Sequence, residues 1–484
     1  MSYKEELAEI VGMENTLDEP DVLLIYASDH SFVREAKPQY VVRAKNAEQI
    51  QKLVQWANEK GVPITLVSSG EPHFRGDTIP LFGGIILDLS QMNKIIRIDR
   101  KNRVAMVEPG VTFAQLQPEL EKAGLWLPSP LCPRGSKSVI GSCLEREPHI
   151  IPRYHVDMSE PLLCVEVIWG TGDIFKSGDA AGPGTIEQQW EFGKPQKFLS
   201  GPGQVSYSRL IQGSQGNMGI VTWATVRCEP LPKIHKLLFV PVERMETLID
   251  FMYRILRLRL GDECLLLNNL DLASILANGA GINTLRQILP PWTLLLGITG
   301  HEILPEERVE YQEKDIMDAA RQFGLIPVTA IPGVDEKELL KSLTKVSSEL
   351  CWKLKYKGEC HDIFFVTTLD KVPEFIDIMR QMAEAHQYSV TDMGIYIQPI
   401  QQGRNCHCEF DLTCDPSDSR EVAKVRELFM EASKALMKEG GFFSRPYGPW
   451  AEMSYSRDAA TREAVRKLKE IFDPNNILNP GKLC

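Results

Sequence analysis

A loop between two apolar runs carries residue types that can bind an anion through the backbone. The runs Val62–Val67 and Ile85–Leu89 are typical of buried strands, and small residues follow the first run directly. Without bulky side chains, successive backbone N–H groups can point into one concavity, which suits a pyrophosphate. The same pattern also fits an ordinary turn after a strand. The candidate binding residues of this loop are Ser68, Ser69, Gly70, His73 and Gly76.

Two later segments repeat this chemistry. In LCPRGSKSVIGSCLER, small residues surround one apolar pair, so a second anion cradle is predicted there. In LIQGSQGNMGIVTWATVRC, the glycines Gly213, Gly216 and Gly219 precede a strand-like run. The first half of the chain therefore carries three glycine- and serine-rich loops of one style.

Residues close to the C-terminus could hold a substrate. Arg445 and Tyr447 stand two apart in SRPYGPW, and arginine keeps its charge, so it can grip a carboxylate or a phenolate. The alternatives are that Arg445 only pairs with a carboxylate such as Glu452, and that Tyr447 is packed in the core. Arg404 is a further candidate anion ligand.

Two histidines next to cysteines raise the question of a soft-metal site. His407 stands between Cys406 and Cys408, and His361 follows Cys360. We predict no metal, and expect His361 and His407 to come together as polar residues of one site.

The surrounding elements must position these residues. We predict a strand at 40–43, a helix that starts at a capping box of Asn46 and Gln49 and stops at Gly61, and then the strand that enters the first loop. VLLIY at 22–26 is predicted as a small strand and 178–206 as a long surface loop. Beyond His235, strands and helices alternate without glycine-rich loops, which indicates a separate α+β lobe. A long helix is expected at 419–439.

The net charge, the apolar runs and the cysteine count exclude several classes of protein. The chain has 484 residues and a net charge of −11, and it has no cluster of Lys and Arg for binding nucleic acid. No apolar run approaches the length of a membrane span, and the acidic N-terminus does not look like a secretory signal. The odd count of 11 cysteines suits reduced thiols. We therefore predict a cytoplasmic protein.

Three motifs together resemble those of one flavoprotein superfamily. They are GGIILDLSQMNKI, GSQGNMGIVTWATVRCEPLP and FDPNNILNPGK. The chain is similar over nearly its whole length to the FAD-binding oxidoreductases of the vanillyl-alcohol oxidase and p-cresol methylhydroxylase superfamily, which also contains the glycolate oxidase and D-lactate dehydrogenase flavoproteins. The resemblance implies an α+β fold with two lobes. The implied units are a lead-in at 1–35, a PCMH-type FAD-binding domain at 36–235, a substrate (cap) domain at 236–415, and a segment at 416–484 that closes the flavin site.

The resemblance also implies FAD as the cofactor and assigns residues to it. Ser68, Ser69 and Gly70 would hold the pyrophosphate through their N–H groups, with Gly76 turning the loop. The other residues carried over are the second loop, Ser138, Val139, Ile140, Gly141 and Ser142, and the segment along the cofactor, Gly219, Ile220 and Val221. His73 and Cys132 match, loosely, residues that attach flavin covalently in some members. The favoured interpretation is that His73 is a polar loop residue and Cys132 a small buried thiol.

On the substrate side, the sequence departs from the metal-binding branch of the superfamily. The glycolate and D-lactate flavoproteins carry GDGNxH and GEHG motifs that ligate a divalent metal. Here QGRNCHCEFD keeps one histidine, His407, while Pro446 and Tyr447 replace the Glu-His pair. The pair Arg445 and Tyr447 is instead closer to the Tyr/Arg pair that binds a phenolate in the phenol-oxidising branch.

The resulting prediction is an FAD-dependent dehydrogenase. The substrate would be a small alcohol or a 4-hydroxybenzyl or phenolic compound, bound by Arg445, Tyr447 and Arg404. A hydride would pass from it to flavin N5. His407 or Tyr447 would take up the proton, with His361 nearby. The alternatives are a metal-free 2-hydroxy-acid dehydrogenase and a flavin-carrying electron-transfer subunit. An external electron acceptor is required, for which an iron-sulfur or cytochrome partner protein is a candidate. A homo-oligomer is left open.

Overall fold

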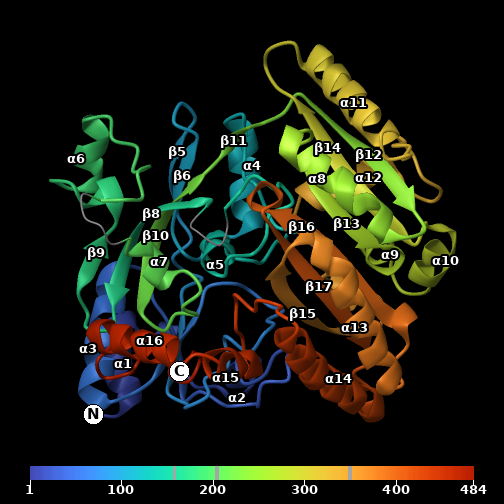
Figure 1. Cartoon of the computed structure of the whole chain (residues 1–484). Coiled ribbons are helices and arrows are strands. Elements are labelled where there is room, and N and C mark those ends of the chain that lie inside the picture. Colours follow the sequence, from blue (N-terminus) through green and yellow to red (C-terminus); the bar gives the residue numbers. More distant parts are fainter. Residues whose placement is uncertain (156–159, 202–205, 347–350, 484) are drawn as a thin grey trace.

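The computed structural model describes residues 1–155, 160–201, 206–346 and 351–483. Figure 1 shows two lobes side by side, with the C-terminal helices running beneath both of them. The fold is α+β, as predicted, and its sheets are separate in the two lobes. No helix among the described residues has the length and apolar character needed to span a bilayer.

The first sheet carries the opening glycine- and serine-rich loop. Its order is β1-β2-β4-β3, and β4 is parallel to both β2 and β3. The Asn46 side chain accepts from the Gln49 N–H to start helix α3, and Gly61 ends that helix at φ +64°. The elements of this part are α1 Tyr3–Val11, β1 Thr16–Leu17, α2 Pro20–Ile25, β2 Tyr40–Arg43, α3 Ala47–Lys60, β3 Ile64–Val67 and β4 Ile85–Asp88.

A second sheet completes the first lobe. It is antiparallel, in the order β5-β6-β10-β8-β9, and a small β11-β7 pair stands beside it. The elements here are β5 Ile95–Asp99, β6 Val104–Val107, α4 Phe113–Lys122, β7 Leu125–Trp126, α5 Val139–Leu144, β8 Leu162–Trp169, β9 Ile174–Lys176, α6 Ile186–Glu191, α7 Ser208–Ile211, β10 Gly219–Arg227 and β11 Glu229–Pro230.

The second lobe is built on one antiparallel sheet in the order β12-β14-β13-β16-β17-β15. Alternate residues face two different cores: Leu238 packs on one face and Leu237 on the other. The elements are β12 Ile234–Val242, α8 Ile249–Leu258, β13 Cys264–Asn268, α9 Asn269–Leu276, α10 Ala280–Ile288, β14 Trp292–Gly300, α11 Pro305–Arg321, α12 Glu336–Thr344, β15 Glu359–Thr367, α13 Val372–Ala385, β16 Met393–Ile400 and β17 Asn405–Cys414.

The C-terminal segment returns to the first lobe. It comprises α14 Ser419–Lys438, α15 Pro449–Tyr455 and α16 Ala459–Phe472. Beyond α16 the chain lies along β3: the Ile64 N–H donates to the Ile477 carbonyl at 2.7 Å, and the Asn479 N–H donates to the Ile64 carbonyl at 2.7 Å. The last residues therefore lie beside the strand that enters the opening loop. The four domain bounds given above remain a prediction.

Two local predictions were wrong. VLLIY lies mostly in helix α2, because Pro20 fits the first turn of a helix and Leu23 and Tyr26, three apart, pack together on the first sheet. The predicted loop at 178–206 contains helix α6, which starts at a capping box of Thr185 and Gln188. Residues 202–205 of that segment lie outside the described residues.

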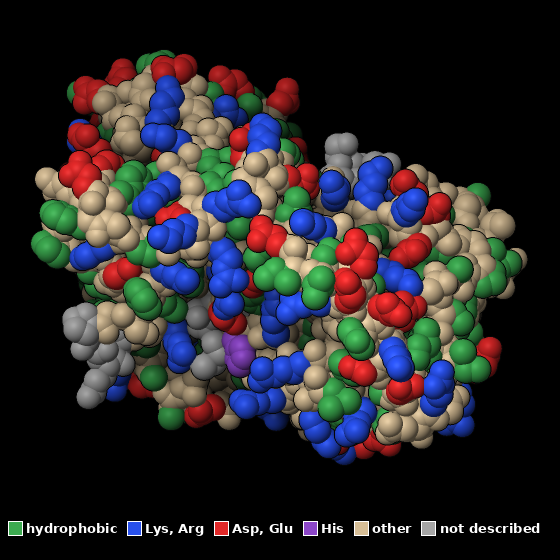
Figure 2. All heavy atoms as spheres, turned by 90° about the horizontal axis from the view of Figure 1, so that it is seen from above, with side chains coloured by type: hydrophobic (Ala, Val, Ile, Leu, Met, Phe, Trp, Pro, Cys, Tyr) green, Lys and Arg blue, Asp and Glu red, His purple; other side chains and the backbone are tan. Residues whose placement is uncertain are grey.

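The charged side chains on one face of the molecule are mixed in sign (Figure 2), in line with the lack of a Lys and Arg cluster in the sequence. On the face shown in Figure 2, Lys and Arg side chains gather toward the middle, with Asp and Glu side chains among them. This face is therefore mixed in charge and does not present the uniformly basic surface that a nucleic-acid backbone requires.

Candidate functional site

Two adjoining cavities lie where the loops of the first lobe meet the sheet of the second. The larger spans about 1140 Å³ and the smaller about 750 Å³, in each case including space that is open to solvent. Leu66, Ser68, Asp77 and Glu145 line both, so the two form one elongated space. A long ligand that is narrow at one end and broad at the other would fit, as a flavin dinucleotide does.

The wall of the smaller cavity combines glycines and serines with apolar side chains such as that of Ile140. A Cβ on Gly141 would stand 3.2 Å from the Ser68 hydroxyl, and one on Gly216, at φ +69°, would stand 2.8 Å from the Leu66 side chain. Gly219 and Val221 at the start of β10 also line this cavity, whereas Ile220 points into the core beneath the first sheet. Close approach of a ligand to the backbone is what these small residues permit.

Several of the predicted pyrophosphate donors are engaged inside the protein. The Gly70 N–H donates to the Ser136 carbonyl at 2.9 Å, and the Ser138 N–H donates to the Ser69 hydroxyl at 3.0 Å. The Gly141 N–H donates to the Ser138 hydroxyl at 2.9 Å, which caps α5. These bonds tie the two loops to each other, so the role of these three N–H groups is to fix the cradle and not to face a ligand.

Three other residues of the predicted cofactor set also serve the scaffold. Val139 is buried in the core of the second sheet, and the Ser142 hydroxyl donates to Glu147 at 2.6 Å. At Gly76, φ is +72° and a Cβ would stand 2.2 Å from Val33, so only glycine fits there.

Unpartnered polar atoms mark the smaller cavity as a binding site. Gln215 Oε1 and Asn479 Oδ1 are buried without a hydrogen-bond partner among the described residues, and both side chains belong to its wall. Buried acceptors of this kind cost free energy unless a ligand satisfies them. The donor groups of a bound nucleotide would satisfy them, so this end fits FAD.

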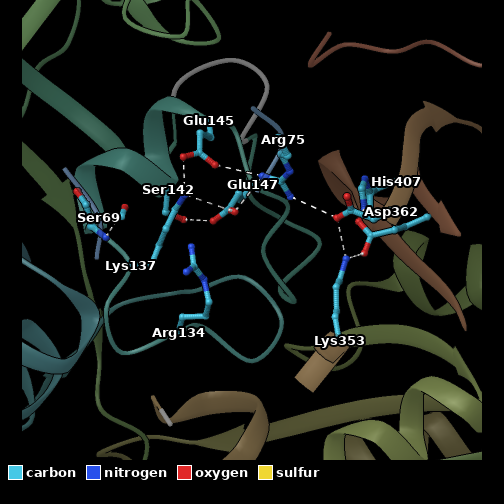
Figure 3. Close-up of polar contacts among 12 residues, drawn as sticks. Ser69, Arg75, Arg134, Lys137, Ser142, Glu145, Glu147, Lys353, Asp362 and His407 are labelled. Atoms are coloured by element: carbon cyan, nitrogen blue, oxygen red, sulfur yellow. Dashed lines mark hydrogen bonds and ion pairs between the residues drawn. The ribbon is translucent and has the colours of Figure 1, made fainter. Parts of the chain in front are cut away.

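A charged network stands at the boundary between the lobes (Figure 3). Arg75 lies 3.1 Å from Glu145, 3.4 Å from Glu147 and, across the boundary, 3.7 Å from Asp362. Lys137 pairs with Glu145. Burial alone would raise the pKa of Glu147, but Lys137 and Arg75 outweigh it and lower the pKa to about 2. Asp77, buried near Glu145, has its pKa raised to about 7.

A buried lysine occupies the centre of an acidic cluster on the second sheet. Lys353 Nζ lies 2.9 Å from Asp362 and 2.9 Å from Asp411, and it also bonds Glu409. Oxygens of these three carboxylates lie within 4.8 Å of one another, which is a spacing that could hold a metal ion. Burial and Glu409 raise the pKa of Asp411 to about 7 although Lys353 lowers it. The ammonium group provides the cation of this cluster.

Arg445 presents an unpartnered guanidinium to the larger cavity. It is buried in the turn after α14, its Cζ lies 4.0 Å from the centre of the Phe364 ring, and its Nη1 has no hydrogen-bond partner among the described residues. Burial and the nearby Arg75 lower its pKa. Glu452 pairs with Arg462 at 3.8 Å instead, so the alternative of an Arg445–Glu452 pair is wrong. Arg445 is free to bind an anion.

Tyr447 lies on the other side of the charged network. It is buried, lines the smaller cavity, and packs under the Arg75 guanidinium at 5.5 Å. Burial and Glu145 raise its pKa well above the ordinary value, so the phenol stays protonated. It therefore suits a hydrogen-bond donor better than a base.

The structure does not bring together the remaining predicted catalytic residues. His407 is buried behind the wall of the larger cavity, where its Nε2 bonds Glu409 at 2.9 Å and its pKa is lowered by burial. His361 stacks on Phe32 at the far end of β15, so the expected approach of His361 and His407 is wrong. Arg404 is exposed in the turn before β17. Cys406 and Cys408 point into the core on the opposite face of β17 from His407.

His73 and Cys132 do line the larger cavity. His73 is buried, and burial together with Arg134 and Lys137 lowers its pKa to about 4, so the imidazole is neutral. Burial also raises the pKa of the Cys132 thiol.

Sequence reasoning missed the acidic and basic residues of the cavity wall. Arg134, Glu147, Lys353, Asp362 and Glu409 come from five places in the chain. One signal was available: CHCEFDLTC places His407, Glu409 and Asp411 at alternate positions of an otherwise apolar strand, which indicates a polar face.

Comparisons with known proteins agree on one type of flavoprotein. Residues 38–177 match the model of the FAD binding domain, and residues 279–483 match the C-terminal domain of FAD linked oxidases. The chain is similar to glycolate oxidase subunit GlcD of Bacillus subtilis, with 24% identity over 99% of this chain and 96% of that protein. It is also 24% identical to the 4-cresol dehydrogenase [hydroxylating] flavoprotein subunit of Pseudomonas putida, over 98% of this chain and 93% of that protein.

Solved structures show the same fold. p-Cresol methylhydroxylase with substrate bound superposes with a TM-score of 0.81 at 22% identity, covering 99% of this chain and 95% of that one. 4-Ethylphenol oxidase from Gulosibacter chungangensis also gives 0.81, at 20% identity, covering 99% and 96%.

Proposed function

The chain belongs to the FAD-linked oxidoreductases, and from this premise we propose that it is a dehydrogenase that removes a hydride from a small anionic substrate. The first candidate class is 4-hydroxybenzyl alcohols and related phenols, bound as phenolates. The observation that carries the proposal is the buried guanidinium of Arg445 at the wall of the larger cavity, because its Nη1 has no hydrogen-bond partner among the described residues. A buried cation of this kind is stabilised by an anionic ligand.

FAD is the cofactor, and we infer that it lies along both cavities. Gly216, Gly219, Gln215 and Asn479 would hold it in the smaller cavity, and Gly141 would leave room for it there without donating its N–H. The bound cofactor supplies the hydride acceptor. Ser69 and Gly70 contribute indirectly, by tying the first loop to the second.

The larger cavity suits a flat ring with one negative end. Phe74, Trp352 and Tyr396 contribute aromatic surface to its wall, and Arg445 contributes the charge. Aromatic walls bind a planar ring by dispersion and desolvation, while the arginine fixes its polar end. This combination supports a phenolic substrate.

The pair of Glu409 and His407 would take up the substrate proton. Glu409 lines the larger cavity, and His407 lies directly behind it, with Nε2 2.9 Å from the carboxylate. The Glu409 carboxylate would receive the substrate proton and pass it to Nε2 of the neutral imidazole, in the tautomer that carries its hydrogen on Nδ1. The Glu409 carboxylate then stabilises the imidazolium, as a buried acid does beside a catalytic histidine.

Substrate binding would need no metal ion. The three carboxylates that come closest to a metal-binding arrangement on the sheet already surround Lys353 Nζ. A divalent ion could enter only by displacing that ammonium, which is buried and bonded to all three acids.

A second candidate class is the 2-hydroxy acids. Arg134 also lines the larger cavity, and among the described residues no carboxylate lies within ion-pairing distance of it. Arg445 and Arg134 could hold a carboxylate from two sides. The similarity to a glycolate oxidase subunit favours this class.

The electrons must leave through an external acceptor, for which we propose a partner protein. The two curated relatives named above are both described as subunits, which supports an iron-sulfur or cytochrome partner. The ten described cysteines are free, which supports a reducing compartment, and we infer the cytoplasm.

An anaerobic substrate panel would test the proposed function. The purified yellow protein is mixed with 4-hydroxybenzyl alcohol, 4-methylphenol, glycolate and D-lactate, and loss of the oxidised flavin absorbance is followed. Bleaching by a phenol supports the first class, and bleaching by a hydroxy acid supports the second. If none of these compounds bleaches the flavin, and the flavin is reduced only in a co-purified complex, the chain is an electron-transfer subunit and not a dehydrogenase.

Acid precipitation would test how FAD is attached. We expect a yellow supernatant, because His73 fits the interpretation of a neutral polar residue at the cavity wall. A yellow pellet would mean a covalent flavin, and His73→Ala and Cys132→Ser would then show which side chain carries it.

A further inference from the structure

A group of metal-binding side chains lies at the far edge of the second sheet, away from both cavities described above. Glu359 and His361 are two apart on β15, and Cys414 on β17 stands directly opposite Glu359 in the antiparallel ladder. Residues two apart on a strand and their cross-strand partner share one face of the sheet. A carboxylate oxygen, an imidazole nitrogen and the thiol sulfur lie within 4.8 Å of one another.

One ring nitrogen of the buried His361 is left unsatisfied by the described residues. The residue is only 4% exposed, and its Nε2 makes no hydrogen bond among the described residues. Nε2 lies 3.6 Å from the Glu359 carboxylate, which is beyond hydrogen-bonding distance. The ring is held in place by stacking on Phe32, with 3.8 Å between ring centres. A fixed and buried nitrogen of this kind is costly unless a ligand satisfies it.

A fourth candidate ligand comes from the first lobe. His30, in the loop after α2, places Nδ1 3.9 Å from the Glu359 carboxylate. Its side chain is 35% exposed, which leaves an entry path from solvent. Both separations, 3.6 and 3.9 Å, run to the Glu359 carboxylate and are close to the edges of a tetrahedron with metal–ligand bonds of about 2.0–2.3 Å. His30 is not in the group whose ligand atoms lie within 4.8 Å of one another, so its imidazole would have to turn toward the ion to complete the set.

We propose that Glu359, His361 and Cys414, with His30 as the fourth ligand, bind a zinc ion. One oxygen, two imidazole nitrogens and one sulfur are ligands that zinc prefers, and a complete tetrahedral set is the mark of a structural site. On binding, the Cys414 thiol loses its proton to solvent and coordinates as the thiolate. Hard cations such as Mg²⁺ would be excluded, because they take oxygen ligands.

The zinc ion would tie the N-terminal segment to the substrate sheet. Next to His30, the Asp29 carboxylate accepts from the Gly76 N–H at 2.6 Å, in the first cofactor loop. His30 also stacks on Phe74, which lines the larger cavity. The ion would therefore hold the cofactor loop against the second lobe from behind. This role does not depend on which substrate the enzyme oxidises.

Cobalt substitution tests the site on the full-length, FAD-loaded protein. After treatment with a chelator, Co²⁺ is added and the difference spectrum is recorded against the same protein without metal. We expect a thiolate-to-cobalt charge-transfer band in the near ultraviolet, saturating at one ion per chain and abolished by Zn²⁺. The absence of that band in the wild type would overturn the proposal.

Variants assign the band to its ligands. Cys414→Ser should abolish it, and the matched control Cys351→Ser, at the wall of the larger cavity, should leave it unchanged. Because Cys414 is buried and its variant could fail to fold, His30→Ala at the exposed position serves as a second probe. It should weaken Co²⁺ binding at least about 10-fold, the loss usual for even an outer-shell partner. An unchanged affinity in His30→Ala would exclude His30 as a ligand, and a band that persists in folded Cys414→Ser would refute the site.

Discussion

At the residue scale, two guanidinium groups lie over the Phe364 ring, and they differ in their partners. Arg75 lies among Glu145, Glu147 and Asp362, whereas Arg445 faces the larger cavity and forms no ion pair with a carboxylate of the described residues. Three carboxylates therefore balance the charge of Arg75, which joins the lobes, although its Nε also lacks a hydrogen-bond partner among the described residues. Arg445 is left to a ligand, and this difference assigns substrate binding to it.

Replacing Arg445 should weaken substrate binding selectively. Arg445→Met removes a charge-assisted hydrogen bond worth roughly 1.5–3 kcal/mol, so the Kd of the reducing substrate should rise about 10- to 150-fold. FAD content should stay the same. The Kd is read from anaerobic flavin bleaching at a series of substrate concentrations.

Arg404→Met provides the matched control for that experiment. Arg404 was also a predicted substrate ligand, but it is exposed and outside the cavity walls described here. We expect the Kd of the reducing substrate for the Arg404→Met variant to match its Kd for the wild type. A large effect of Arg404→Met with none from Arg445→Met would reverse the assignment.

Lys353 should stabilise the second lobe strongly. Lys353→Met would leave Asp362, Glu409 and Asp411 buried together without a cation, a change that costs about 3–5 kcal/mol in the free energy of unfolding. Lys357→Met is the matched control, because Lys357 bridges Asp392 and Glu421 nearer the surface and should cost only about 1 kcal/mol. Urea unfolding measures both. Equal losses would mean that the acidic cluster does not depend on its ammonium.

At the element scale, short loops shape the cofactor site by their close contacts. The turn at 213–216 reverses the chain before β10 with left-handed backbone at Gly213, Gln215 and Gly216. Gly216 lies against Leu66 on β3, so the turn and the first strand together form one wall of the smaller cavity. A side chain at position 216 would displace that wall.

Gly216→Ala should therefore impair FAD binding. Its Cβ would stand 2.8 Å from Leu66 Cδ1, and φ is +69°. Gly61→Ala is the matched control: φ is +64° at the end of α3, with open space around the new Cβ. We expect both variants to lose roughly 1 kcal/mol of stability from the strained backbone. Only Gly216→Ala should also raise the Kd for FAD, measured by quenching of flavin fluorescence, and an equal effect of Gly61→Ala would contradict this.

At the scale of the whole molecule, the C-terminal segment joins elements that are far apart in sequence. Lys482 Nζ donates to the Ile79 carbonyl at 2.6 Å, and burial lowers its pKa to about 8. The Asn479 side chain donates to the Gln215 carbonyl at 2.6 Å. The tail thus connects the first loop with the turn before β10, and the closing role of residues 416–484 stays a prediction.

Buried neutral histidines should make the whole molecule acid-sensitive. Burial lowers the pKa of His73 and His149 to about 4, below the ordinary 6.5. The unfolded chain therefore binds more protons between these values, and stability is lost as the pH falls from about 6.5 to 4, by up to ~1.4 kcal/mol per pH unit for each group. Above pH 6.5 these two histidines should not change the free energy of unfolding with pH, because they are neutral in both the folded and the unfolded chain.

His149→Gln should flatten that loss. Urea unfolding at pH 5 and at pH 7.5 gives the difference in the free energy of unfolding for the wild type and for the variant. We expect a smaller difference in the variant. The same difference in both proteins would show that His149 is protonated alike in the folded and unfolded states.

The sequence by itself determined the local elements and the type of cofactor. The capped helix 47–60, the buried strands at 64–67 and 85–88, and the glycine-rich turns follow from periodicity, capping and backbone freedom, which neighbouring residues decide. The three motifs were sufficient to identify an FAD-linked oxidoreductase. In contrast, helix α2 was mistaken for a strand, because its packing onto the first sheet outweighed the propensity of VLLIY.

Only the tertiary structure decided which polar groups meet. Arg75, Lys353, Asp362 and Glu409 are separated by up to 334 positions, yet they form one charged network. It also decided that Arg404 is exposed, that His361 and His407 stay apart along one sheet, and that several loop N–H groups donate to carbonyl and hydroxyl oxygens of the same loops. Such contacts depend on which face of the sheet each side chain occupies. A one-residue change in strand register would move every side chain of that strand to the opposite face.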